Sequence, residues 1–200
     1  MKAIIRKSSI FIFMLVLGAF NSQAQQAKEW KLDKDHTSVT FAVKHFFSTV
    51  NGNFTEYDGS FSFDSDKITG SKFTFNIPVS SINTNNKKRD THLNSEDFFN
   101  AEKFPEIKFV STKFEKKSDT EFIVHGDLTI KDVTKKVAIP VEITGKMEHP
   151  MMKGTKILGL AFKTSINRTD YKVGTGNWAT TMVVGDNVDV EINLELNRKE

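Results

Sequence analysis

The stretch Val188-Asp-Val-Glu-Ile-Asn-Leu-Glu-Leu196 decides the fold class, because every second residue in it is apolar. Successive side chains of a β-strand point to opposite faces, so this pattern predicts a strand with one apolar and one polar face. The same alternation recurs through most of the chain. It is present at residues 39–43, 61–63, 73–79, 107–109, 122–124, 128–130, 137–143 and 158–166.

These rows predict eight strands, and short links join most of them. Turn-forming pairs such as Asn51-Gly52 and Lys153-Gly154 stand between the rows, and short links make consecutive strands antiparallel neighbours. Eight half-apolar strands can hide their apolar faces by closing into a barrel, although a two-sheet sandwich would also hide them. The predicted strands span residues 36–47, 52–64, 68–79, 106–116, 120–131, 135–148, 155–167 and 186–197.

One long connection, from Ser80 to Phe104, interrupts the strand pattern. Its segment 86–93 has helical composition, and Ser95 is a typical N-cap for a second helix. Connections of this length in compact domains are commonly functional or contain helices. We therefore expect a mainly β chain that forms an eight-stranded antiparallel barrel. One or two short helices in the connection, near residues 84–104, would lie over one opening.

The N-terminus has the order of a secretory signal. Three basic residues precede the apolar run Ile10–Phe20, and Ser22 and Ala24 have the small-x-small spacing of a cleavage site. A run of eleven apolar residues is too short for a membrane anchor, which needs about 20. We expect a cleaved signal at residues 1–24, and an exported chain that begins at Gln25 and forms a single domain over residues 25–200.

Charge and cysteine content narrow the function classes. The predicted signal holds three basic and no acidic residues, so the rest of the chain has equal numbers of basic and acidic side chains. This balance argues against a nucleic-acid binder, which would show a basic stripe. The chain has no cysteine, so the fold has no disulfide and depends on its core.

Phenylalanine is the most informative residue type. Fifteen of the 18 Phe follow the predicted signal, and many occupy the alternating rows. Plain core packing would explain any single one. Collectively, however, they would line the bore of an eight-stranded barrel, which is wide enough either to be filled or to hold one small ligand. An apolar bore predicts a binding protein for a prenyl or acyl chain.

Titratable residues support an enzyme less well. The five histidines lack a spacing such as H-x-x-x-H, so we expect no metal site and no cofactor. The cluster Arg89-Asp-Thr-His92 could act as an acid/base group, but an Arg–Asp pair that pins the connection is the simpler interpretation. Arg168 stands at a strand end, either at a rim or in solvent. The alternatives are thus a periplasmic lipid enzyme using Asp90, His92 or His45, and a stress-related structural or interaction protein with a filled barrel.

Seven stretches, in order and spread over nearly the whole mature chain, also resemble the YceI-like family. They are Trp30-Lys-Leu-Asp33, His36-Thr-Ser-Val-Thr-Phe41, Ser81-Ile-Asn-Thr-Asn-Asn-Lys-Lys-Arg-Asp-Thr-His-Leu-Asn-Ser-Glu-Asp-Phe-Phe99, Phe104-Pro-Glu-Ile-Lys-Phe109, Gly126-Asp-Leu-Thr-Ile-Lys-Asp-Val-Thr-Lys135, Ile166-Asn-Arg-Thr-Asp170 and Val184-Gly-Asp-Asn-Val188. The resemblance implies an extended, lipocalin-like barrel, exported to the periplasm, that holds an isoprenoid or similar lipid and is not an enzyme. One departure is Tyr171-Lys172, where the family pattern usually has Phe-Gly.

Together, the pattern and the resemblance predict the binding residues and the partners. The expected partner is a long-chain lipid such as an isoprenoid. We expect no nucleic-acid partner and no stable membrane insertion after signal cleavage. A homodimer is compatible with the sequence. Residues at the mouth that would contact a headgroup or pin the loop are His45, Arg89, Asp90, His92 and Arg168. The expected lipid-binding residues are Phe41, Val43, Phe61, Phe75, Ile77, Leu93, Phe98, Phe109, Leu128, Ile139, Leu160, Phe162 and Ile166.

Overall fold

The computed structural model describes residues 27–180 and 182–200. The predicted signal and its cleavage site therefore lie outside the described residues. Within the described part, no helix has both the length and the apolar character needed to cross a membrane. The elements are β1 (Glu29–His45), β2 (Ser48–Phe54), β3 (Asp58–Ser62), β4 (Lys72–Pro78), η1 (Val79–Ser81), β5 (Ile82–Asn83), α1 (Lys87–Asn94), β6 (Glu106–Lys116), β7 (Glu121–Ile130), β8 (Val133–Glu148), β9 (Thr155–Asn167), η2 (Arg168–Tyr171), η3 (Gly176–Trp178) and β10 (Val184–Lys199).

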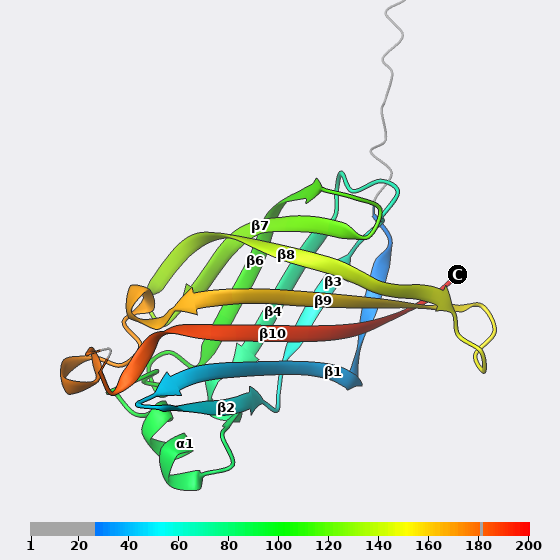
Figure 1. Cartoon of the computed structure of the whole chain (residues 1–200). Helices are drawn as coiled ribbons and strands as arrows, with labels where there is room; N and C mark the ends of the chain where they lie inside the picture. Colours follow the sequence, from blue (N-terminus) through cyan, green and yellow to red (C-terminus); the bar gives the residue numbers. More distant parts are fainter. Residues whose placement is uncertain (1–26, 181) are drawn as a thin grey trace, which may run out of the picture.

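Eight antiparallel strands close into a barrel in the order β1, β3, β4, β6, β7, β8, β9 and β10 (Figure 1). Closure comes from the pairing of β10 with β1, whose register runs from Lys31 opposite Asn197 to His45 opposite Val184. The predicted antiparallel barrel is confirmed, and the two-sheet alternative is wrong. Closure pairs β1 with β10, so the edges that these two strands would expose in an open sheet are joined to each other.

Strand β1 differs most from the prediction, because it begins at Glu29 and changes its partner along its length. Trp30 pairs with β3, whereas residues 39–45 pair with β2. A register shift between Asp33 and Ser38 separates the two halves, and the Tyr57 hydroxyl donates to the Thr37 carbonyl there. Because this segment is polar and irregular, the first half of β1 lacks the apolar alternation that predicts a strand. The predicted strand 52–64 is likewise divided into β2 and β3.

One end of the bore, near the C-terminus, is filled by packed side chains. Phe63, Phe122 and Leu196 are buried there, and the ring of Phe63 meets that of Phe122 edge-on at 5.5 Å. The Trp30 indole donates to the Phe63 carbonyl at 2.9 Å, and the Arg198 guanidinium lies 4.9 Å from the Trp30 ring. We call this end the plug. Any internal space must therefore lie towards the opposite end, beside the β1–β2 turn and α1.

The connection between β4 and β6 contains one α-helix rather than two. Asn86 caps the start of α1, since its side chain accepts a hydrogen bond from the Arg89 amide. The prediction that Ser95 caps a second helix is wrong: its hydroxyl donates to the His92 carbonyl at the end of α1. The chain then turns sharply through Asn100, whose φ of 53° lies in the left-handed region. That turn stops a further helix from forming.

Candidate ligand-binding cavity

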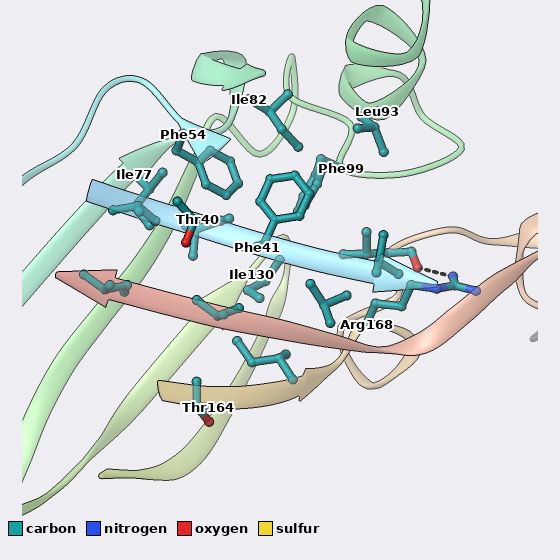
Figure 2. Close-up of a pocket in the computed structure, with 18 of the residues that line it drawn as sticks. Thr40, Phe41, Phe54, Ile77, Ile82, Leu93, Phe99, Ile130, Thr164 and Arg168 are labelled. Carbon is teal, nitrogen blue, oxygen red and sulfur yellow. Dashed lines mark hydrogen bonds between the residues drawn. The ribbon is translucent and has the colours of Figure 1, made fainter. Parts of the chain in front are cut away.

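The half of the bore that the plug leaves open holds a cavity of about 510 Å³ (Figure 2). This volume lies within the range of small-molecule sites. Phe61, Phe73 and Phe162 form its floor, because they line the cavity and adjoin the plug. Residues from β1, β10, α1 and the loops around η3 surround the other end. Lys88, an exposed residue on this wall, places the opening beside α1.

Nearly all the apolar residues predicted to bind lipid lie on the cavity wall. The exception is Leu160, which is on the same strand face as Phe162 but one step closer to the plug, where it is 1 % exposed. The predicted residues that do line the cavity are Phe41, Val43, Phe61, Phe75, Ile77, Leu93, Phe98, Phe109, Leu128, Ile139, Phe162 and Ile166. The structure thus brings these side chains together, and their contact with a lipid stays a prediction.

Sequence reasoning missed other wall residues, five of which share a strand face with a residue that it named: Val39, Phe73, Ile107, Val124 and Ile130. Phe73 alternates with Phe75 on β4, and Val39 alternates with Phe41 on β1, so period-two parity would have found both. Trp178 comes from the loop before β10, where no periodic signal exists. Additional apolar wall residues are Val50, Phe54, Ile82, Phe99, Ile107, Val124, Ile130, Val173, Val184, Val188, Val190, Ile192 and Leu194.

Two glycines let aromatic rings lie flat against the wall. Gly52 on β2 stands opposite Phe41, and a Cβ atom at position 52 would lie 2.3 Å from Cζ of Phe41. Likewise, a Cβ atom at Gly126 on β7 would lie 2.5 Å from the ring of Phe109. Any other residue would push these rings away from the strands. The two glycines therefore help to set the width of the bore.

The titratable residues on the cavity wall are all of basic types. They are His45, Lys88, Arg89, His92 and Arg168, and none of the described residues that line the cavity is Asp or Glu. The predicted mouth residue Asp90 points elsewhere: its carboxylate accepts hydrogen bonds from the amide and hydroxyl of Thr84. Four uncharged polar residues, Thr40, Thr84, Asn86 and Thr164, also line the cavity, and the rest of the wall is apolar.

Arg168, which was expected at the mouth as a headgroup contact or a loop-pinning residue, is a structural clamp. Only 5 % of the residue is exposed, and its guanidinium donates to the carbonyls of Val173, Trp178, Val184 and Gly185 at 2.8–2.9 Å. Burial lowers the pKa of Arg168, and the carboxylate of Asp186 opposes that shift. This side chain ties the end of β9 to the start of β10 at the cavity mouth. Sequence gave no periodic signal for it.

The Arg89–His92 cluster also has mainly structural partners. Arg89 donates to the hydroxyl and the carbonyl of Thr84, so Thr84 joins Arg89 to Asp90 in place of the expected direct pair. His92 Nε2 lies 2.9 Å from a carboxylate oxygen of Asp97, not at a backbone carbonyl. Its ring packs edge-on against Phe98 and Trp178. These contacts hold the connection over the mouth.

The departure at Tyr171-Lys172 leaves the turn intact. Lys172 has φ 57° and ψ 31°, a left-handed conformation that glycine adopts more easily. Tyr171 is buried, and the Lys172 ammonium pairs with Asp132 at 2.8 Å. Lys131 donates to the Lys172 carbonyl and so braces the same turn. A glycine at position 172 would adopt this backbone without strain. With lysine there, the ion pair to Asp132 and the hydrogen bond from Lys131 hold the turn in place.

A second cluster of possible ligands lies near the plug. Asp33, His36 and Glu195 could each offer one atom to a metal ion, with His36 Nδ1 3.2 Å from Asp33 and 3.8 Å from Glu195. A hydrogen bond to Asp33 and the two carboxylate charges raise the pKa of His36, and these interactions explain the cluster without an ion. The histidine spacing used in the sequence search misses this group, since it contains only one histidine and its third member is distant in sequence.

The fold and the cavity together define a class of protein: an antiparallel barrel with a mainly apolar cavity in its bore. Residues 30–196 match the YceI-like domain, and the chain belongs to this family. The YceI protein of Salmonella arizonae is 33 % identical over 172 residues, which cover 84 % of this chain and 88 % of that protein.

Solved structures are similar over most of the chain. A YceI protein of Campylobacter jejuni is 36 % identical with a TM-score of 0.71, covering 86 % of this chain and 99 % of that one. A polyisoprenoid-binding domain of Saccharophagus degradans, implicated in plant cell wall breakdown, has a TM-score of 0.63 at 13 % identity, over 86 % of this chain and 98 % of that one. At that identity the likeness concerns the fold alone.

Proposed function

We propose that this protein is an exported carrier that holds one long apolar lipid, isoprenoid-like or acyl, in the bore of its barrel. The observation that carries the proposal is the open half of the bore, whose wall is mainly apolar, with a few basic and four uncharged polar residues. Each buried methylene group stabilises such a complex by about 0.8 kcal/mol, so a chain of about a dozen carbons could bind tightly without polar contacts. The cavity argues against a barrel filled by its own side chains.

The direct test is organic extraction of the purified protein followed by mass spectrometry. We expect about one long-chain lipid per protein molecule. A protein that carries no lipid, and that takes up none from added polyprenol or fatty acid, would contradict the proposal. The variant Phe75→Asp serves as a control for the site, because Phe75 lines the cavity and is buried.

The alternative function is an enzyme that acts on the lipid through His92 at the mouth. Its contacts with Asp97, Phe98 and Trp178 favour a role in packing instead. We expect His92→Ala to lower stability by about 0.5–1.5 kcal/mol, the value of one hydrogen bond, and to leave lipid loading near normal. Turnover of the extracted lipid by the wild-type protein that disappears selectively in His92→Ala would favour the enzyme.

Export is a second part of the proposal and depends on the N-terminal sequence. The basic start, the apolar run and the small-x-small site support a cleaved signal and a periplasmic or secreted mature chain. A lipid carrier in that compartment would move through an aqueous phase and would take up its ligand from a membrane. Fractionation of cells that produce the full-length chain tests the location independently of lipid binding.

A further inference from the structure

The turn between β1 and β2 exposes two adjacent phenylalanines to solvent. Phe46 is 57 % exposed and Phe47 is fully exposed, and the two residues form the whole turn between the paired residues His45 and Ser48. Phe46 has a φ of 49°, a left-handed conformation that favours glycine over bulky residues. A phenylalanine pair is therefore unfavourable in this turn, both for the backbone conformation and for the exposure of two apolar rings to water. Departures of this kind from local rules are typical of functional sites.

A second apolar residue lies in the loop that meets this turn. The Phe46 amide donates to the Val183 carbonyl at 3.1 Å, and the neighbouring Met182 is 81 % exposed. The two loops are therefore joined at the same end of the barrel, on the left of Figure 1. We call Phe46, Phe47 and Met182 the apolar tip.

The apolar tip is continuous with the mouth of the cavity. His45 immediately precedes the tip, Val184 follows it in the second loop, and both line the cavity. The plug closes the other end of the bore, so a ligand must enter and leave beside the tip. Figure 2 shows Leu93 and Phe99, from the α1 connection, above β1, and Arg168 near the end of that strand. An apolar surface at the only unplugged end of the described barrel is where a lipid would pass.

Charge around the mouth indicates the kind of surface that the tip would meet. Lys87 and Lys88 are exposed at the start of α1 and form no ion pair within residues 27–180 and 182–200. Of the acids in the same connection, Asp90 and Asp97 are engaged by Thr84 and His92, whereas Glu96 is exposed. Lysines on α1 and exposed aromatic residues in the β1–β2 turn, both at the open end of the barrel, match a membrane interface with anionic headgroups.

We propose that the apolar tip inserts into the interface of an anionic bilayer, so that the cavity mouth faces the membrane and a lipid passes between bilayer and bore without crossing water. This inference rests on the proposed carrier function and adds how the ligand is loaded. Insertion would bury two aromatic rings that are now in water, and Lys87 and Lys88 would contact lipid phosphates. The strained, exposed turn would then have a role in loading.

The test compares the wild-type protein with a variant that repairs the turn. Only Phe46 of the two turn residues has a positive φ, which suits Gly followed by a small polar residue. The double variant Phe46→Gly, Phe47→Ser should therefore keep the wild-type melting temperature. The matched control is Met151→Ser, Met152→Ser in the β8–β9 turn, which exposes apolar side chains near the plug.

Vesicle flotation measures docking, with phosphatidylcholine vesicles that contain phosphatidylglycerol and with phosphatidylcholine alone. We expect the wild type and the methionine variant to float with the anionic vesicles. The partition coefficient of the tip variant onto these vesicles should be lower by a factor of about ten or more. Transfer of a pyrene-labelled long-chain lipid from these vesicles into the protein should slow in parallel. Lipid loading from detergent solution, where no bilayer is needed, should be equal for all three proteins.

Three results would overturn the inference: a wild type that does not float, a tip variant that floats and loads like the wild type, or equal binding to neutral vesicles. Sedimentation velocity, which measures the oligomeric state, tests whether a second copy of the chain binds the tip instead of a membrane. Wild-type dimers that the tip variant abolishes, without vesicle binding, would make the tip an interface between copies. Failure of the carrier function is separate, since it would appear as no loading from detergent solution by any of the three proteins.

Discussion

Replacing Gly52 by alanine should narrow the bore without unfolding the barrel. The new Cβ atom would lie 2.3 Å from Cζ of Phe41, whereas carbon atoms pack at about 3.5–4.0 Å, so the ring must move by about 1.2–1.7 Å. The wall formed by β1 and β2 lies behind the ring, and Phe54 lies beside it at 5.6 Å. The free direction is therefore into the cavity, which would lose room for about one or two methylene groups.

At about 0.8 kcal/mol for each methylene group, this loss corresponds to about 4- to 15-fold weaker binding of a long-chain ligand. The matched control is Gly145→Ala on β8, where no atom lies within 4 Å of the added Cβ. Titration with a fluorescent acyl or prenyl probe measures affinity, and thermal melting checks the fold. If both alanine variants bind as tightly as the wild type, the ring of Phe41 does not bound the ligand site, and our account of the wall is wrong.

Four other perturbations test separate parts of the structure. Phe75→Asp should abolish lipid retention, because a carboxylate in the apolar bore lacks a partner, whereas Phe75→Leu should retain lipid; normal loading of the Asp variant would contradict the assigned facing. Arg168→Met should destabilise the protein by about 3–5 kcal/mol in chemical denaturation, since several carbonyls at the mouth lose their donor; a change under about 1 kcal/mol would refute the clamp. The raised pKa of His36, due first to its hydrogen bond with Asp33, means that its stabilisation is complete below about pH 6.5 and is lost as pH rises through the folded-state pKa. The melting-temperature advantage of wild type over His36→Gln should therefore be larger at pH 6 than at pH 8, and a constant difference would exclude this linkage. Mass spectrometry of the exported protein should find Gln25 at the N-terminus, and retention of residues 1–24 would rule out the cleaved signal.

Local conflicts in the sequence mark places where tertiary contacts decide the conformation. Lys172 and Phe46 both adopt left-handed backbone, although neither is Gly or Asn. At Lys172 the ion pair with Asp132 and the hydrogen bond from Lys131 accompany the strain. Phe46 has a backbone hydrogen bond to Val183, but its ring stays largely exposed. The first conflict is compensated within the chain, and the second led to the inference of a membrane partner.

The sequence by itself determined most of the strands, which of their residues share a face and that hairpin-linked strands run antiparallel, although it missed the first half of β1 and placed the first turn at Asn51-Gly52, which lies inside β2. Strict alternation, as in Val188–Leu196, places side chains on a face because the strand repeat is two residues. The Phe-rich rows also predicted an apolar wall, and all but Leu160 of the named apolar residues lie on the cavity. Leu160 has the predicted face but lies too deep, beside the plug.

Only the tertiary structure decided that the sheet closes, and how much of the bore stays open. Closure depends on the register of β10 with β1, between residues more than 130 positions apart, which local periodicity does not encode. The open volume depends on where large rings such as Phe63 and Phe122 meet across the bore, and on Gly52 and Gly126, which let other rings lie flat. The clamp of Arg168 likewise depends on carbonyls that gather only after folding. Periodicity specifies the direction of each side chain, whereas cavities and clamps arise from distances between chain segments.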